Sequence, residues 1–262
     1  MEIIVLIKQV PDIEKVRFDA EKGRIDRSSA PAETNPFDLN ALEAAIQLKE
    51  KLGGSITVLS MGPKQAESSL RDALARGADK AILLTDGRFA GADTLATAYT
   101  LAAAIKKLGR FDLIICGEKT VDGDTGQVGP EVAEFLGIPH VAYVSEIREI
   151  HQDKLLLVSD MGDKYLIEVK LPALITVTKD LNTPRLPSLR DVLKARKKKI
   201  EVWDADTLSD YGDLDGFGVK GSKTMVVKVV IPSEKGRKGM IFRGEDAAEK
   251  LLEVLRENRL VN

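Results

Sequence analysis

The sequence predicts an α/β fold in which a mostly parallel sheet is covered by helices on both faces. Short apolar runs rich in β-branched residues alternate along the first half of the chain with longer segments of helical periodicity. The apolar runs are continuous, which is typical of parallel strands buried on both sides. With 262 residues and 44% hydrophobic content, the chain can bury a full core and should form one substantial domain plus an extension.

The elements of this pattern can be placed in order. The predicted strands are Ile3–Ile7, Ile56–Ser60, Ala81–Thr85 and Leu113–Cys116, and the predicted helices between them are Leu39–Leu52, Ala66–Arg76 and Thr94–Leu108. Asp38 is a candidate cap for the first helix, and Gly53 with Gly54 gives its stop.

The pattern changes in the second half of the chain. Three consecutive strands joined by short turns are predicted at Val141–Ile150, Lys154–Asp160 and Lys164–Lys170, before Ala173–Thr178 returns to the core. Such strands would extend the sheet in antiparallel fashion.

From Thr183 onward the chain is thinly apolar, and we expect it to pack on another surface. A strand at Val226–Ile231 and a helix at Gly244–Glu257 are the predicted elements there. The predicted organisation is therefore an α/β domain at 1–183 and an extended C-terminal arm at 184–262.

Overall composition gives no support to several classes of function, although a local basic patch could still bind an anion. A net charge of −2 gives no global reason to bind nucleic acid or an anionic membrane, and no apolar run approaches the ~20 residues of a membrane span. The one cysteine, Cys116, ends an apolar strand and is expected to be a buried structural thiol. Because the sequence shows no metal-ligand spacing, no metal site is expected. Because it shows neither a signal peptide nor a membrane span, a soluble cytoplasmic protein is expected.

A glycine-rich segment is the main functional signal. The strand ending at Cys116 runs into residues 117–130 and then into the helical pattern Glu131–Leu136. A strand-to-helix turn of this kind presents backbone N–H groups and a positive dipole end, where α/β folds hold phosphates, although such turns are also glycine-rich for steric reasons alone. Asp122 and Asp124 would repel phosphate, so we expect them to cap N–H groups or hold a ribose hydroxyl, leaving Thr125 and Gln127 as neutral ligand contacts.

The segment after the first strand excludes a standard dehydrogenase domain. Lys8-Gln9-Val10-Pro11-Asp12 stands where the dinucleotide fingerprint Gly-x-Gly-x-x-Gly would be.

Several blocks together carry a resemblance to a known family. The chain resembles the β subunits of electron transfer flavoproteins nearly end to end, in blocks that come in family order: Val5–Asp12, Asn35–Asp38, Met61–Pro63, Leu74–Asp79, Asn182–Arg185 and Lys194–Lys199. The resemblance implies a heterodimer in which an α subunit carries a redox-active FAD. The β subunit would supply a Rossmann-like nucleotide-binding domain and a C-terminal arm that embraces the α subunit.

The family has two types, and the resemblance favours one. In the simple type the β site holds AMP with a structural role. In the electron-bifurcating type it holds a second FAD that accepts hydride from NADH and sends one electron to the α-subunit FAD and one to a ferredoxin-type low-potential carrier. Residues 122–130 closely resemble the bifurcating type, the capped helix start Gly91–Thr97 supports it, and the tail helix Gly244–Leu255 does so more loosely.

The resemblance also implies site residues. Phosphate and ribose contacts are expected from Asp122, Gly123, Asp124, Thr125, Gly126, Gln127, Val128 and Gly129; adenosine contacts from Leu6, Asn35, Phe37, Asp38 and Met61; and further dinucleotide contacts from Asp93, Thr94 and Thr97. Leu189 would anchor an acyl-CoA dehydrogenase-like or quinone-linked oxidoreductase. No catalytic acid, base or nucleophile is expected, because the flavin carries the redox chemistry.

The same residues also allow simpler explanations that involve no ligand, partner or electron transfer. Asp93 could be a plain helix cap, and Leu189 could be a core residue. As a whole, the chain could instead be a simple AMP-binding β subunit, or a stress-type adenine-nucleotide module without electron transfer.

Overall fold

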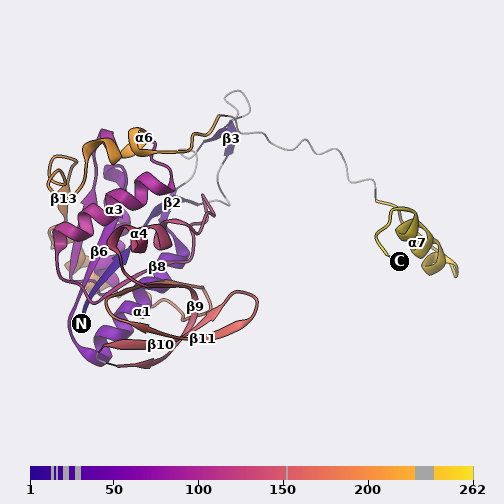
Figure 1. Ribbon diagram of the computed structural model, residues 1–262, viewed down its shortest axis with the longest axis horizontal. Coiled ribbons are helices and arrows are strands. Elements are labelled where there is room, and N and C mark those ends of the chain that lie inside the picture. Colours follow the sequence, from indigo (N-terminus) through magenta and orange to yellow (C-terminus); the bar gives the residue numbers. More distant parts are fainter. Residues whose placement is uncertain are drawn as a thin grey trace. The chain divides into compact units, whose positions relative to one another are not determined.

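The computed structural model of the chain describes residues 1–12, 15, 17–19, 24–26, 31–151, 153–227 and 239–261. Contacts divide the chain into two compact units, Met1–Val227 and Lys228–Asn262. The first unit contains the sheet and all of the elements that surround the candidate site (Figure 1).

A nine-stranded sheet forms the centre of the first unit, in the order β11-β10-β9-β12-β8-β1-β6-β7-β13. Its strands are β1 (Glu2–Leu6), β6 (Ser55–Met61), β7 (Lys80–Leu84), β8 (Leu113–Gly117), β9 (His140–Ile150), β10 (Lys154–Asp160), β11 (Lys164–Lys170), β12 (Ala173–Val177) and β13 (Glu201–Trp203). Neighbouring strands are parallel except where β10 pairs with β9 and β11. Two short antiparallel pairs, β2 (Gln9–Pro11) with β5 (Ala32–Thr34) and β3 (Arg17–Asp19) with β4 (Arg24–Asp26), lie outside this sheet.

Helices cover both faces of the sheet, which confirms the predicted α/β class. On one face, α1 (Pro36–Leu52), α2 (Glu67–Arg76) and α5 (Leu189–Lys197) close a core with Ile3, Val5 and Ile115. On the other, α3 (Thr94–Leu108) and α4 (Val128–Leu136) lie side by side and cover Ile4, Leu59 and Ile114 (Figure 1). Strand residues alternate between the two cores, as the two-residue period of a strand requires.

The predicted elements of the first 178 residues are confirmed, with shifted starts at two helices. α1 begins at Pro36 rather than Leu39, because proline lacks the N–H that a first-turn residue leaves unpaired and its φ suits the helix. α4 begins at Val128 rather than Glu131 and includes Pro130 in its first turn. The predicted antiparallel strands are β9, β10 and β11, which extend one end of the sheet.

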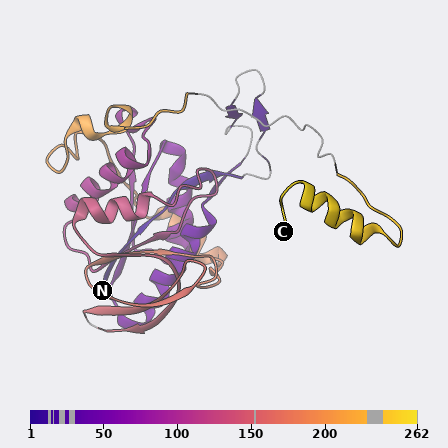
Figure 2. The same cartoon turned by 45° about the vertical axis from the view of Figure 1, so that its right-hand side comes forward.

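Residues 184–227 belong to the first unit, although the sequence predicts an arm from residue 184. β13 pairs in parallel with β7, and the chain then runs over α3 through two short helical turns, η5 (Leu214–Gly216) and α6 (Gly218–Gly221) (Figure 2). Phe217 is 1% exposed and packs edge-on against Phe89. Leu208 and Phe217 of this stretch are therefore buried within the chain itself, whereas other apolar residues, such as Leu186 and Leu189, stay exposed.

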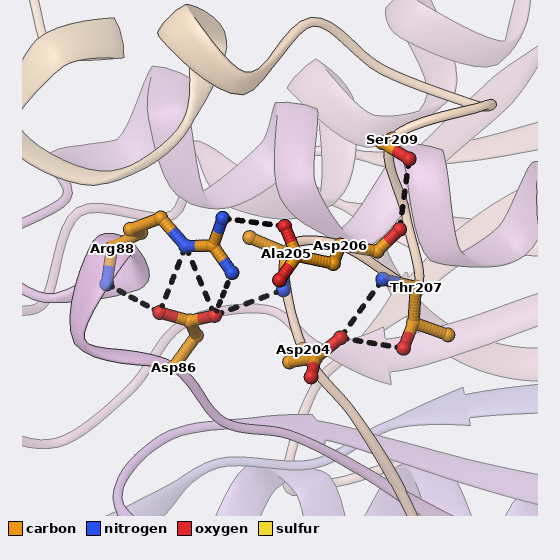
Figure 3. A network of polar contacts seen from close by, with 7 residues as sticks. All are labelled: Asp86, Arg88, Asp204, Ala205, Asp206, Thr207 and Ser209. Atoms are coloured by element: carbon orange, nitrogen blue, oxygen red, sulfur yellow. Dashed lines mark hydrogen bonds and ion pairs between the residues drawn. The ribbon is translucent and has the colours of Figure 1, made fainter.

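A polar network fastens the segment after β13 to the segment after β7 (Figure 3). The Asp86 carboxylate accepts the backbone N–H of Ala205 and pairs with the Arg88 guanidinium, which also contacts Asp206 at 2.7 Å. Hydrogen bonds from Arg88 outweigh partial burial and hold the pKa of Asp86 well below its usual value. The network therefore places the chain after β13 beside the carboxyl edge of the sheet.

The second unit contains α7 (Ala247–Glu257), which confirms the predicted tail helix within three residues at its start. Leu251 and Leu252 are exposed on it. Of the strand predicted at residues 226–231, Val226 and Val227 are not in a strand and the remainder lies outside the described residues. None of the helices in the described ranges combines the length and the apolar character that crossing a membrane requires.

Candidate functional site

The candidate site lies where the chain order of the sheet reverses. From β1 the chain moves outward through β6 and β7, then crosses back to β8 on the other side of β1 and continues to β12. α1, which follows β1, and α4, which follows β8, therefore lie on opposite faces of the sheet. The carboxyl ends of two such strands diverge into a crevice, the usual ligand position in open α/β sheets.

Asp38 ties the two strands together at this point. Its side chain accepts the backbone N–H of Lys8 at 2.8 Å, just after β1, and that of Gly117 at 3.0 Å, at the end of β8. The predicted cap role is wrong, because Asn35 occupies the cap position of α1 and Asp38 points back at the strands. Burial is the main cause that raises the pKa of Asp38 to about 7, against the opposing effect of the two hydrogen bonds.

Asn35 holds the glycine-rich loop, residues 117–127, against the start of α1. Its Nδ2 donates to the carbonyl of Lys119 at 2.9 Å, and its Oδ1 accepts the N–H of Val121 at 3.2 Å. Asn35 is fully buried and its side chain makes no capping hydrogen bond to α1. Its two polar atoms are thus both committed to the loop.

The two aspartates of the loop are ion-paired. Lys8 Nζ contacts both carboxylate oxygens of Asp122, at 2.8 and 2.9 Å. Lys119 Nζ lies 2.8 Å from Asp124 and 5.8 Å from the centre of the Phe37 ring. These lysines offset the negative charge that would otherwise oppose an anionic ligand at the loop.

Two glycines are required by close packing around the loop. A Cβ on Gly117 would lie 2.6 Å from both Asp38 Oδ1 and Phe37 Cβ. A Cβ on Gly129 would lie 2.7 Å from Thr176 and 2.9 Å from the Cys116 sulfur, so glycine allows α4 to approach the sheet. The start of α4 is thereby fixed directly above the ends of β8 and β12.

The first turn of α3 meets the loop from the side of β7. The Thr94 hydroxyl lies 3.1 Å from Gln127 Oε1 and 3.2 Å from Glu131 Oε1. The second carboxylate oxygen of Glu131 is buried and has no hydrogen-bond partner among the described residues. Burial, reinforced by the charge of Asp93, raises the pKa of Glu131.

Asp93 is the cap of α3 and accepts the N–H of Ala96 at 3.0 Å. The prediction that Asp93 caps this helix is thus confirmed. The cap does not test whether Asp93 also contacts a dinucleotide.

The other predicted site residues fall at the same edge, with one exception. Leu6 and Met61 are the last residues of β1 and β6, Leu6 buried and Met61 half-buried in the core under α3 and α4. Thr97 is half-buried, one turn after Thr94. Leu189 lies elsewhere, at the start of α5, and its side chain is 76% exposed. The alternative of Leu189 as a core residue is therefore wrong.

Sequence reasoning missed the lysines and Glu131. Lys8 lies two residues after the end of β1. Its place at the carboxyl end of a strand that pairs with β8, the strand before the loop, could have indicated it. The pairings of Lys119 and Glu131 depend on how the loop folds back and on how α3 packs on α4, so nothing local in the sequence indicates them.

The residues present fit a nucleotide. As at the start of any α-helix, the first N–H groups of α4 have no acceptor within the helix, so they can bind a phosphate. The loop before them is anchored near both ends, through Lys119 and Gln127. The orphaned oxygen of Glu131 offers an acceptor for a sugar hydroxyl.

The thiol at the end of β8 is part of the packing below the site. Cys116 is buried, and desolvation raises the pKa of its thiol, which confirms the expected structural role. The described residues contain no group of three metal-ligating side chains.

Comparisons with known proteins agree with this geometry. The sequence profile of the electron transfer flavoprotein domain matches residues 22–208. The chain is 48% identical to the electron transfer flavoprotein subunit beta of Thermoanaerobacterium thermosaccharolyticum, over the whole of both chains. It is also 41% identical to caffeyl-CoA reductase-Etf complex subunit CarD of Acetobacterium woodii, again over both whole chains, and 40% identical to protein FixA of Azotobacter vinelandii, over 96% of this chain and 92% of the relative.

Proposed function

We propose that the chain, which belongs to the electron transfer flavoprotein family as a β subunit, binds FAD at the crevice between β1 and β8. We also propose that it acts in NADH-dependent electron bifurcation. Bound FAD would supply hydride acceptance and one-electron transfer. The protein's part is to bind, to orient and to balance charge.

The loop clamp is the observation that carries this proposal. Asn35, Lys8 and Thr94 hold the loop from three separate elements, so its backbone is fixed before any ligand arrives. A fixed set of N–H groups binds an anion without the entropic cost of ordering the loop. Residues 122–129 are accordingly assigned to the phosphates and the adjoining ribose.

The ends of β1 and β6 and the start of α1 are assigned to the adenosine. Leu6 and Met61 supply apolar surface at the strand ends, and Phe37 contributes a half-buried ring beside Lys119. Asn35 and Asp38 act by holding the backbone around them, since both have their polar atoms committed to the protein.

The first turn of α3 is assigned to the flavin-bearing half of the dinucleotide. The hydroxyls of Thr94 and Thr97 and the free oxygen of Glu131 provide hydrogen-bonding groups for a polyhydroxyl chain. The resemblance of residues 122–130 to bifurcating β subunits favours FAD over AMP.

The partners follow from the family. β subunits of electron transfer flavoproteins pair with an α subunit. We further propose a ferredoxin-type carrier as the low-potential acceptor, and an acyl-CoA dehydrogenase-like or quinone-linked oxidoreductase that docks on the exposed Leu189. The relative from A. woodii is named as part of a reductase complex, which is consistent with a docked dehydrogenase-like partner.

Nucleotide analysis of the co-expressed α–β heterodimer tests the cofactor assignment. Two FAD and no AMP per heterodimer are expected. One FAD with one AMP would refute bifurcation and leave the simple electron carrier, whose β site holds AMP. Because the family is established, a stress-type adenine-nucleotide module is no longer a competing class.

A further inference from the structure

The Asp93 carboxylate binds two separate parts of the chain. One oxygen caps α3 through the N–H of Ala96. The other accepts three hydrogen bonds from residues far along the chain: the N–H of Lys223 at 2.8 Å, the N–H of Thr224 at 2.9 Å and the Thr224 hydroxyl at 3.0 Å. The N–H of Asp93 itself donates to the Ser222 hydroxyl at 2.8 Å.

These contacts are set in a closely fitted surface. A Cβ on Gly218 would lie 2.0 Å from the carbonyl oxygen of Arg88, and one on Gly91 would lie 2.6 Å from the Val219 side chain. Both glycines have positive φ, at 55° and 71°. The chain from Gly218 to Thr224 thus fits against the segment that leads into α3.

The charge of Asp93 suits this role. Burial would raise its pKa, but the hydrogen bonds from Ala96, Thr224 and Lys223 outweigh burial and lower the pKa to about 2. The side chain is therefore ionised at physiological pH, and hydrogen bonds to an ionised acceptor are the strong class.

The position of these contacts gives them a consequence beyond stability. The first compact unit ends at Val227, soon after Thr224, and the second unit with α7 follows. The next residue after Asp93 is Thr94, which contacts the loop residue Gln127. One residue thus joins the last anchored point of the first unit to the helix turn at the candidate site.

We propose that Asp93 is a positioning residue that fixes the point from which the C-terminal segment leaves the first unit, and that it thereby couples α-subunit binding to occupancy of the nucleotide site. The coupling rests on the proposed function and on the binding of the α subunit by the C-terminal segment, which the family resemblance implies, whereas the anchor at Ser222–Thr224 rests on neither. Ligand contacts at this turn then come from Thr94 and Thr97, while the Asp93 carboxylate stays with the protein.

Substitution with serine separates the two tasks of Asp93. Serine caps a helix about as well as aspartate, so Asp93→Ser keeps the cap of α3, but its short side chain lacks the second oxygen that holds Lys223 and Thr224. Asp86→Ser is the matched control, because Asp86 also caps a short helical turn and also holds a later segment through the N–H of Ala205.

Hydrogen exchange of the full chain, measured by mass spectrometry, tests the anchor. Asp93→Ser should raise exchange at residues 222–224 by about tenfold or more, with little change at residues 205–207. Asp86→Ser should show the reverse pattern. Unchanged exchange at residues 222–224 in Asp93→Ser would overturn the proposal whatever the chain binds.

Association with the α subunit tests the coupling. With the nucleotide bound, wild type should bind the α subunit more tightly than without it, and Asp93→Ser should lose most of that difference while Asp86→Ser keeps it. Loosened exchange together with an unchanged nucleotide effect would overturn the coupling and leave Asp93 as a structural anchor alone. A wild-type chain that binds neither FAD nor AMP would refute the proposed function, while the exchange result would still decide the anchor.

Discussion

Replacing Asn35 with alanine should weaken nucleotide binding by removing the clamp on the glycine-rich loop. The change deletes the hydrogen bonds to the Lys119 carbonyl and from the Val121 N–H. Each is worth about 0.5–1.5 kcal/mol net, so the loop should lose about 1–3 kcal/mol of restraint. Because Asn35 makes no capping hydrogen bond to α1, the helix itself should be little affected.

The measurement is the nucleotide dissociation constant of the heterodimer, together with its urea unfolding. If the loop must be held to bind the ligand, 1–3 kcal/mol corresponds to a Kd raised about 5- to 150-fold. Asn40→Ala is the matched control. Asn40 is also a buried asparagine and lies in the helix that follows Asn35, but it holds the carbonyl of Asn182, at 2.8 Å, rather than the loop.

Asn40→Ala should lower stability by a similar amount and leave the Kd unchanged. The reasoning would be refuted if both variants raised the Kd equally, or if Asn35→Ala lost stability without any change in Kd.

Three further changes probe other parts of the account. Folding raises the pKa of Asp38 to about 7, so between pH ~4 and about 7 the native state keeps a proton that the unfolded state releases. The free energy of unfolding should therefore fall as the pH rises through this range. Urea unfolding at several pH values should show this fall in the wild type and not in Asp38→Asn. Gly129→Ala forces a methyl group to within 2.7 Å of Thr176 and should cost about 1–3 kcal/mol in unfolding free energy and lower nucleotide content; retention of both would show that α4 can shift without harm. Leu189→Ala should change stability by less than ~0.5 kcal/mol, since the side chain is 76% exposed, yet raise the KM for the dehydrogenase partner in electron-transfer assays; an unchanged KM would remove Leu189 from the docking surface.

The sheet and the loop could be predicted because their signals are local. Continuous apolar runs predicted β1, β6, β7 and β8, and the glycine-rich segment after β8 predicted the turn into α4. β13 could not be predicted, because Glu201–Trp203 is too short for a periodic pattern and exists only through its pairing with β7.

The stretch from residue 184 to residue 227 belongs to the first unit through contacts that its sequence does not indicate. Few of its residues are apolar, yet Phe217 and Leu208 are fully buried against the core under α3. Its attachment depends on single polar residues, Asp86, Arg88 and Asp93, whose distant partners no spacing rule reveals. For the same reason Asp38 was expected to cap its own helix, whereas it spans two strands.

Anaerobic titration of the α–β heterodimer with NADH, followed by flavin absorbance, shows whether NADH reduces the heterodimer directly. If the β subunit holds FAD between β1 and β8 as proposed, NADH should reduce the heterodimer without any added dehydrogenase. A flavin spectrum that NADH leaves unchanged, in a heterodimer that dithionite still reduces, would contradict this proposal.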